Sequence, residues 1–127
     1  MRPSLTLLLV LFCLLLIGCK HEPKNPSEAA ERYYGYLVEG DVDKYMQSVA
    51  NFDSLPEDYR SQLRDMHLQH LYNEQRLRGG LVSAKAMRDT MLDANHAVVF
   101  MEVAYADSTI EQIMVPVMHT EEGWRMQ

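Results

Sequence analysis

Residues 97–119, AVVFMEVAYADSTIEQIMVPVMH, decide the fold. Two apolar segments, 97–106 and 109–119, are rich in β-branched and aromatic residues and are separated by Asp107-Ser108. Strands have this composition, and a short polar turn between two of them is typical of an antiparallel hairpin. We therefore expect this stretch to form two neighbouring strands of one sheet.

A strand is also expected on each side of this hairpin, at 81–92 before it and at 124–127 after it. Turn-forming residues separate these strands from the hairpin, at 93–95 (Asp-Ala-Asn) and at 121–123 (Glu-Glu-Gly). Consecutive strands joined by such short turns pair with their neighbours. The sequence thus predicts a four-stranded antiparallel meander.

Both faces of the two central strands are apolar. One face would carry Val99, Met101, Val103, Tyr105, Ile113, Val115 and Val117, and the other Val98, Phe100, Ala104, Ile110, Met114 and Met118. A sheet with one face in water alternates apolar with polar residues, so we expect both faces to be covered, one by helices and the other by a partner, a ligand or a second subunit. Pro116 lacks a backbone N–H, which indicates a bulge or an edge there and hence a bent sheet.

Two helices are expected before the sheet. Ser27 is placed to act as the N-cap of the first, which Gly40 ends, and Asp41 is placed to cap the second. Apolar residues recur at helical spacing in both. These residues are Ala30, Tyr33, Tyr34 and Leu37 in the first helix, and Val42, Tyr45, Met46 and Val49 in the second.

A third, longer helix is predicted from residues 54–57 (Ser-Leu-Pro-Glu), which form a capping-box pattern, to Arg78. Gly79-Gly80 would end it. Its expected apolar stripe is Tyr59, Leu63, Met66, His70 and Leu77. The three helices and the meander together predict an α+β domain, with the helices packed on a curved sheet.

The amino terminus has the pattern of a signal peptide. After Met1 and Arg2, the apolar run Leu5–Leu16 is shorter than the ~20 residues that a membrane-spanning helix needs. The following Leu16-Ile17-Gly18-Cys19 resembles the lipobox of bacterial prolipoproteins. That resemblance implies cleavage after Gly18 and acyl chains on Cys19, which would anchor the protein to a membrane of a bacterial cell envelope, the outer membrane being favoured over the inner.

This interpretation divides the chain into a signal peptide (1–18), a lipidated cysteine with a short tether (19–26) and one α+β domain (27–127). Cys13 would leave with the signal, so no thiol remains for a disulfide, a metal site or a nucleophile. With 11 lysines and arginines against 18 acidic residues, the mature protein would carry about −7. This charge disfavours nucleic acid as a partner.

The order of elements resembles the nuclear-transport-factor-2-like fold, and more narrowly small envelope lipoproteins of unknown function that carry this domain. The likeness rests on residues 29–34 (AAERYY), on Gly40-Asp41 with Tyr45 after it, and on residues 123–125 (GWR). The resemblance implies a cone whose concave side holds a small ligand, and a sheet face that is often used for homodimerisation. Enzymes and binding proteins both occur on such folds, so the fold does not choose between them.

Three residues on the third helix have the geometry of a metal site. His67, His70 and Glu74 lie within a narrow arc of one face, where two imidazoles and a carboxylate could bind a divalent ion. The spacing matches no established closed site, and no fourth ligand is evident. We therefore expect no metal, and interpret His70 as a hydrogen-bonded core histidine.

A second candidate is a pocket formed by Tyr33, Tyr34, His70 and Tyr105. An acid–base site there would combine Tyr34 or Tyr33 and His70 with an acidic residue of the sheet, Asp89 or Glu102, because apolar burial raises a carboxylate pKa. The alternative is that both tyrosines are core aromatics.

Phosphate-binding glycine loops and the common hydrolase and metalloprotease motifs are absent, so no cofactor is expected. The sequence favours a non-enzymatic lipoprotein that binds a small apolar ligand or an envelope protein. The alternative is a small lyase, isomerase or hydrolase that uses the same cavity.

Overall fold

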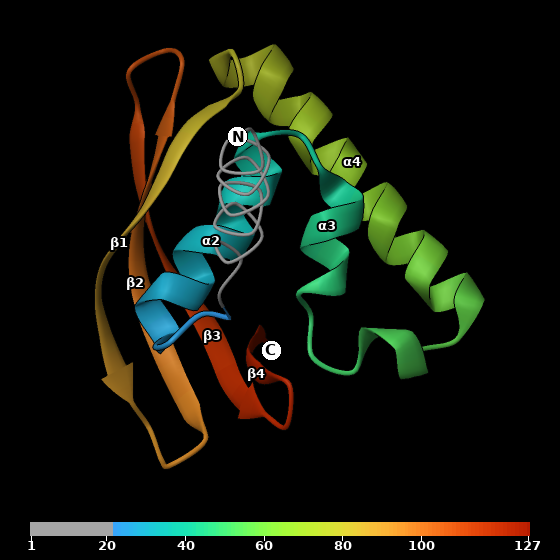
Figure 1. The fold of residues 1–127 in the computed structure, drawn as a ribbon. Coiled ribbons are helices and arrows are strands. Elements are labelled where there is room, and N and C mark those ends of the chain that lie inside the picture. Colours follow the sequence, from blue (N-terminus) through green and yellow to red (C-terminus); the bar gives the residue numbers. More distant parts are fainter. Residues whose placement is uncertain (1–21) are drawn as a thin grey trace, which may run out of the picture.

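The computed structural model describes residues 22–127, and the predicted signal peptide and Cys19 lie outside them. Helices come first and strands follow (Figure 1). The elements are α2 (Pro26–Val38), α3 (Val42–Gln47), the 3₁₀ helix η1 (Phe52–Ser54), α4 (Glu57–Arg78), β1 (Leu81–Met91), β2 (His96–Tyr105), β3 (Ile110–Thr120) and β4 (Gly123–Met126). The predicted α+β class, with three α-helices before a four-stranded sheet, is confirmed.

The strands pair in chain order, β1-β2-β3-β4, and every pair is antiparallel. Two irregularities in the register of β1, at Leu81–Ser83 and at Ala86–Arg88, are the bulges that help to curl the sheet. Pro116 pairs with Val98 without a register shift, and its carbonyl accepts from the Gln127 N–H at 3.1 Å. Pro116 is therefore at an edge position rather than at a bulge.

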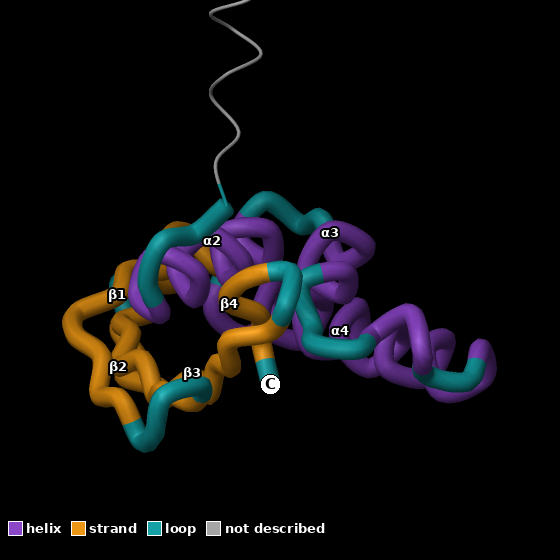
Figure 2. Tube along the Cα trace, turned by 60° about the horizontal axis from the view of Figure 1, so that its bottom comes forward, coloured by secondary structure: helices purple, strands orange, loops and turns teal. Residues whose placement is uncertain are grey.

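Helix α2 lies in the hollow of the curled sheet (Figures 1 and 2). Ala29 and Ala30 are completely buried, and small side chains of this kind let the helix backbone approach the strands closely. Larger core residues surround this contact from the sheet and from α3. These are Tyr33 and Leu37 of α2, Val42, Tyr45 and Met46 of α3, and Ala97, Val99, Met101, Val115, Val117, Trp124 and Met126 of the sheet.

The first helix begins earlier than predicted. Its N-cap is Asn25, whose Oδ1 accepts from the Glu28 N–H at 2.8 Å, and Pro26 occupies the first helical position. Ser27 is therefore not the cap, because the proline before it is already helical and favours that position. The Ser27 hydroxyl donates instead to Asp89 Oδ2 at 2.6 Å. The predicted cap of α3 is confirmed, since Asp41 Oδ1 accepts from the Lys44 N–H at 3.0 Å.

Helix α4 begins without the predicted capping box. Its N-cap is Pro56, which makes no side-chain capping bond, and Ser54 belongs to η1, where its hydroxyl donates to the Asn51 carbonyl. The predicted end is confirmed. Gly79 adopts a left-handed φ of 80°, and the Gly79 and Gly80 N–H groups donate to the carbonyls of Gln75 and Glu74.

The predicted apolar stripe of α4 is wrong. Tyr59, Met66, His70 and Leu77 are exposed, and none of the residues of α4 is fully buried. Of the predicted stripe only Leu63 is partly covered, and it shares one face with Arg60, His67, Leu71, Glu74 and Arg78, which are also partly covered and follow at spacings of three or four. No helix within residues 22–127 combines the length and apolarity needed to cross a membrane.

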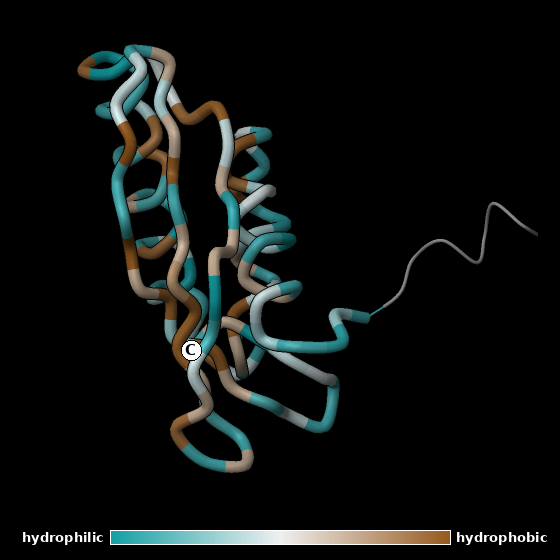
Figure 3. The backbone as a smooth tube through the Cα atoms, turned by 90° about the vertical axis from the view of Figure 1, so that its left-hand side faces the viewer, coloured by the Kyte–Doolittle hydropathy of each residue, from teal (hydrophilic) through white to brown (hydrophobic). Residues whose placement is uncertain are grey.

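No element among residues 22–127 packs over the convex face of the sheet, opposite α2. Ile110 and Met114 of β3 are 64% and 68% exposed there, and Met87 of β1 is also exposed. Figure 3 looks from this side and shows apolar residues recurring along the strands. Arg88 covers part of this face, with its guanidinium 4.1 Å from the centre of the Phe100 ring. That a partner, a ligand or a second subunit covers this face stays a prediction.

Candidate functional site

A cavity of about 640 Å³ opens between α4, α3 and the concave side of β3. We call it the cone cavity. Its walls are mostly apolar or aromatic, and several come from elements far apart in the sequence. The side chains used below are Tyr34 of α2, Tyr45 and Met46 of α3, Leu63 and His67 of α4, and Val115 of β3.

The cavity lies beneath α4, which ion pairs hold in its first half and at its C-terminal end. Toward the start of α4, Arg64 Nε lies 2.8 Å from Asp43 Oδ1 of α3. At the other end, Arg78 Nη1 lies 3.1 Å from Glu111 Oε2 of β3, and the Arg78 carbonyl accepts from the Asp107 N–H. Figure 1 shows α4 running diagonally on the right-hand side of α2 and α3, and the helix has no fully buried residue.

Three rings form a row on the cavity wall. Tyr34 meets Tyr45 edge to face, with ring centroids 6.2 Å apart at 82°. Tyr45 in turn meets His67 with centroids 5.0 Å apart at 76°. Such edge-to-face contacts are favourable for aromatic rings and fix their relative orientation. The row therefore presents two phenols and one imidazole in a defined arrangement.

Burial keeps this row uncharged. It raises the pKa of the Tyr34 phenol well above the ordinary range, with further increases from the neighbouring tyrosines and carboxylates. Burial likewise raises the pKa of Tyr45. It lowers the pKa of His67, and the nearby His70 lowers it further. At neutral pH the row offers hydroxyl donors and a neutral imidazole, which suit a ligand with an uncharged polar group.

A polar cluster adjoins the row through Tyr34. Arg78 is its centre, with Nε 3.4 Å from Glu74 Oε2, Nη1 3.1 Å from Glu111 Oε2 and the guanidinium 4.4 Å from the centre of the Tyr105 ring. Burial raises the pKa of Tyr105, and the Glu111 and Glu74 carboxylates raise it further. The same two carboxylates also raise the pKa of Tyr34. Arg78 is thus the shared ion-pair partner of Glu74 and Glu111, beside the phenols of Tyr34 and Tyr105.

The structure brings only part of the predicted pocket together. Tyr34 is on the cavity wall and Tyr105 is in the adjoining cluster. Tyr33 points elsewhere, since its hydroxyl donates to the Trp124 carbonyl at 2.8 Å and accepts from Arg125 Nη1 at 2.8 Å. His70 is exposed and does not line the cavity, so its interpretation as a core histidine is wrong.

The predicted acid–base set is not assembled. Asp89 of β1 lies beside the start of α2, where its carboxylate accepts hydrogen bonds from Ser27. Glu102 pairs in register with Lys85 and lines a hollow on the convex side of the sheet. The histidine that does line the cavity is His67, which sequence reasoning placed only in the metal hypothesis. Its spacing of four residues from Leu63 and from Leu71 was the available signal.

Among residues 22–127, no three His, Cys, Asp or Glu side chains are grouped closely enough to hold a metal ion. The set His67, His70 and Glu74 does not converge, because His70 is exposed and Glu74 is held at Arg78.

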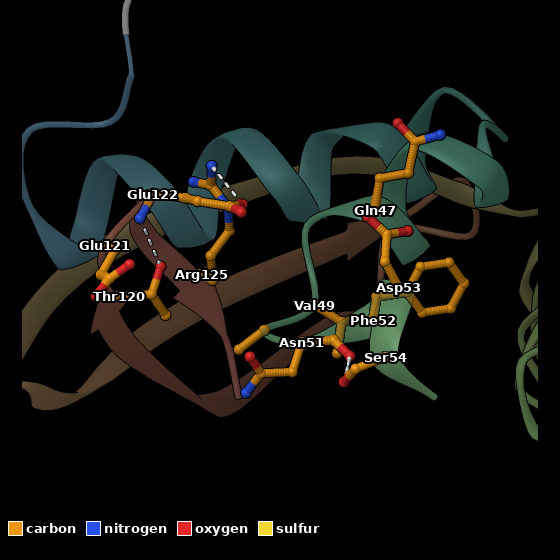
Figure 4. A pocket seen from close by; sticks show the side chains of 11 residues that line it. Gln47, Val49, Asn51, Phe52, Asp53, Ser54, Thr120, Glu121, Glu122 and Arg125 are labelled. Atoms are coloured by element: carbon orange, nitrogen blue, oxygen red, sulfur yellow. Dashed lines mark hydrogen bonds and ion pairs between the residues drawn. The ribbon is translucent and has the colours of Figure 1, made fainter. Parts of the chain in front are cut away.

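A second hollow, of about 380 Å³, lies between the segment around η1 and the β3–β4 turn (Figure 4). Asn51, Asp53, Glu121 and Glu122 are polar and exposed there, and Arg125 reaches its rim. It lacks the fixed aromatic row of the cone cavity and is smaller. The cone cavity is therefore the stronger candidate site.

The depressed pKa of His67 predicts a pH-dependent stability. As pH falls through the ordinary histidine value of 6.5, the unfolded chain binds a proton that the folded chain resists, so the free energy of unfolding decreases. His67→Gln removes this proton linkage and flattens the dependence. The measurement is urea unfolding at about pH 7.5 and about pH 5.5.

The matched control is His70→Gln, which removes an exposed imidazole one turn away and should keep most of the decrease. An equal decrease in the wild type and in His67→Gln would show that His67 is not held neutral by the fold.

Comparison with known proteins supports the fold alone. No protein-family model matches the chain, and no curated protein matches it either. Among solved structures, it is similar to a Campylobacter jejuni protein named, provisionally, as an NTF2-like transpeptidase. The two share 15% identity, with a TM-score of 0.63 over 81% of this chain and 97% of the other. The fold of residues 22–127 is therefore nuclear-transport-factor-2-like.

Proposed function

We propose that this protein is a lipoprotein of a bacterial envelope whose cone cavity binds a small, largely apolar molecule with an uncharged polar group. The row of Tyr34, Tyr45 and His67 in a cavity of about 640 Å³ carries the proposal. Ligand sites for small molecules typically have ~300–1,000 Å³ and apolar walls with a few polar groups, as this cavity does.

Binding is favoured over catalysis by the chemistry of the walls. The described residues lining the cone cavity include no serine, threonine, cysteine or lysine, which are the common nucleophiles of acyl and peptidyl transfer. The nearest carboxylates, Glu74 and Glu111, do not line the cavity and are ion-paired with Arg78. The transpeptidase name of the Campylobacter protein is thus not a sufficient reason to propose that activity for this chain.

The competing proposal is a lyase, isomerase or hydrolase. The observation in its favour is that Tyr34, on the cavity wall, lies within the field of Glu74 and Glu111 in the adjoining cluster. A phenol donor and a carboxylate can together perform general acid–base chemistry. Turnover of a captured molecule, lost in Tyr34→Phe, would support this alternative.

The binding proposal predicts that a small molecule co-purifies with the protein from its own envelope. Leu63→Trp introduces bulk at the cavity wall and should abolish co-purification, because the added indole fills space that the ligand needs. Native mass spectrometry of the purified protein measures the bound mass.

Leu68→Trp is the matched control, since Leu68 belongs to the same helix but not to the cavity wall, and should leave the bound mass unchanged. Retention of the ligand by Leu63→Trp and its loss from Leu68→Trp would contradict the cone cavity as the site.

Membrane attachment through Cys19 is the second part of the proposal. Its support is the sequence Leu16-Ile17-Gly18-Cys19 at the end of a short apolar run. Two or more acyl chains hold a protein stably at a bilayer, whereas one chain alone binds only marginally.

Cys19→Ser should therefore abolish incorporation of labelled palmitate and leave the precursor unprocessed at Gly18. Metabolic labelling followed by mass measurement of the purified chain tests both. Normal labelling of the variant would exclude Cys19 as the acylated residue.

We also propose that the exposed convex face of the sheet forms a homodimer. The apolar residues Ile110 and Met114 are prominent on it, and large exposed apolar groups of this kind favour association. A symmetric dimer would place the same face of each copy against the other.

Ile110→Glu puts a charge on this face, outside the lining of the cone cavity, and should convert the dimer to a monomer by light scattering. Leu77→Glu is the control, because Leu77 is also a large exposed apolar residue but lies on α4. A wild-type protein that is monomeric at every concentration would rule out the dimer.

A further inference from the structure

Residues 22–26, the first of the described chain, pack against the domain surface. Pro23 and Pro26 are buried, and the Lys24 N–H lies 3.5 Å from Glu28 Oε2. Glu22 Oε2 accepts from Arg125 Nη1 of β4 at 3.2 Å. Residues 22–26, which the sequence predicts as a tether, thus pack on the fold from Glu22 onward.

This attachment sets how far the domain can be from its anchor. Glu22 is the third residue after Cys19, and a fully extended chain gains at most ~3.6 Å per residue step, or about 11 Å in all. If Cys19 carries lipid, as proposed above, the part of the domain next to Glu22 must lie close to the lipid headgroups. The face around Glu22 is then the face toward the bilayer.

A small hollow of about 240 Å³ lies beside Glu22, on the side of α2 and α3 away from the cone cavity. Three of its lining side chains are cationic, namely Arg32, Lys44 and Arg125, whereas Glu22 is its single acidic one. The whole chain has a formal charge of −6, whereas the side chains that line this hollow sum to +2. We call this hollow the basic pocket.

The cations of the basic pocket differ in how firmly they are held. Arg125 is fixed by Glu22, by the Tyr33 hydroxyl at 2.8 Å and by the Trp124 carbonyl at 2.9 Å. Glu122 is a further carboxylate near it, at 3.9 Å from Nη2. Arg32 is paired with Glu28 at 3.2 Å. Each guanidinium therefore already has a carboxylate partner.

Lys44 is different. Its ammonium lies 5.4 Å from the centre of the Tyr36 ring, and among residues 22–127 no carboxylate forms an ion pair with it. The side chain is exposed at the rim of the pocket, with Gln47, also exposed, beside it. A cation that has no acidic partner inside the fold is available to an anion from outside.

We infer that the basic pocket binds the phosphate of an anionic phospholipid headgroup beside the acyl anchor. The volume supports a headgroup-sized guest, because it falls below the ~300–1,000 Å³ of sites for drug-sized ligands. Basic residues next to a membrane surface attract anionic lipids by roughly fivefold in affinity per charge, and the attraction is screened by salt. Lys44 supplies the unpaired charge, and Arg32 and Arg125 define the rest of the rim.

The orientation is tested with the acylated full-length protein in vesicles. Residues 20–127 contain no cysteine, so one introduced cysteine gives a unique site for a nitroxide spin label. Gln47→Cys places the label at the basic pocket, and Gln112→Cys places a matched label at an exposed glutamine of β3. Nickel chelated on lipid headgroups should relax the label at position 47 several-fold more than the label at position 112. Equal relaxation at both positions would overturn the proposed orientation.

The headgroup is tested by changing the lipid and the charge. Adding phosphatidylglycerol to phosphatidylcholine vesicles should strengthen relaxation at position 47, and Lys44→Glu should remove this increase. Lys85→Glu, an equal charge change on β1, should not. An increase that persists in Lys44→Glu, or no increase at all in the wild type, would overturn the headgroup site. If free glycerol phosphate abolishes the increase at the concentration of vesicle phosphate, the pocket binds soluble phosphate and not a membrane lipid.

Mass measurement of the same preparation separates this proposal from the one on which it rests. A chain without acyl groups would refute the anchor itself, whereas an acylated chain with equal relaxation at both positions would refute only the orientation.

Discussion

The close packing of α2 into the hollow of the curled sheet is the contact on which the rest of the structure depends. Ala29 and Ala30 have no exposed surface, so the helix backbone lies directly against the strands. Any larger side chain at these two positions would push the helix outward, and overpacking a core in this way is destabilising. The same contact positions Tyr33 under Trp124 and Tyr34 toward α3, so α2 builds both the core and one wall of the cone cavity.

With α2 filling the hollow of the sheet, little of the concave surface is left for α4. That helix has 22 residues but no fully buried side chain. It closes the cavity from outside instead of completing the core, and its partly covered face is polar at one end. Glu74 and Arg78 can face inward there because Arg78 is ion-paired with both Glu74 and Glu111. The cavity and the exposed apolar residues of α4 both arise because α2 already occupies the concave side of the sheet.

The sheet could be predicted from the sequence because its signal is local and repeated. Alternation in β2 and β3 follows the period of two, and the turn residues fall where the turns are. Gly40 and Gly79 likewise act through backbone geometry and Asp41 through a capping bond to Lys44, and both effects are local and depend little on tertiary contacts. Ser27 and Ser54 were misassigned as caps because a proline nearby shifted each helix start by one or two residues.

The orientation of α4 could not be predicted in the same way. Each residue advances a helix by about 100°, so His67 and His70, three residues apart, lie about 60° from each other around the axis, and a rotation of that size separates the predicted stripe from the observed face. Hydrophobic periodicity assumes that the apolar face is the buried one, and α4 leaves Tyr59, Met66 and Leu77 exposed. The sequence therefore pointed to His70 as the pocket histidine, whereas the structure places His67 on the cavity wall.

The end-fastened arrangement of α4 has a consequence for traffic into the cone cavity. The ion pairs at Asp43 and at Glu111 are solvent-accessible, and such pairs are individually weak and are weakened further by salt. Beside and between these ion pairs, α4 contacts the core through side chains that are only partly buried, namely Leu63, His67 and Leu71, so it is held less firmly than α2 or the sheet. If the cone cavity binds a ligand as proposed, a higher ionic strength around the domain would ease the entry and exit of that ligand.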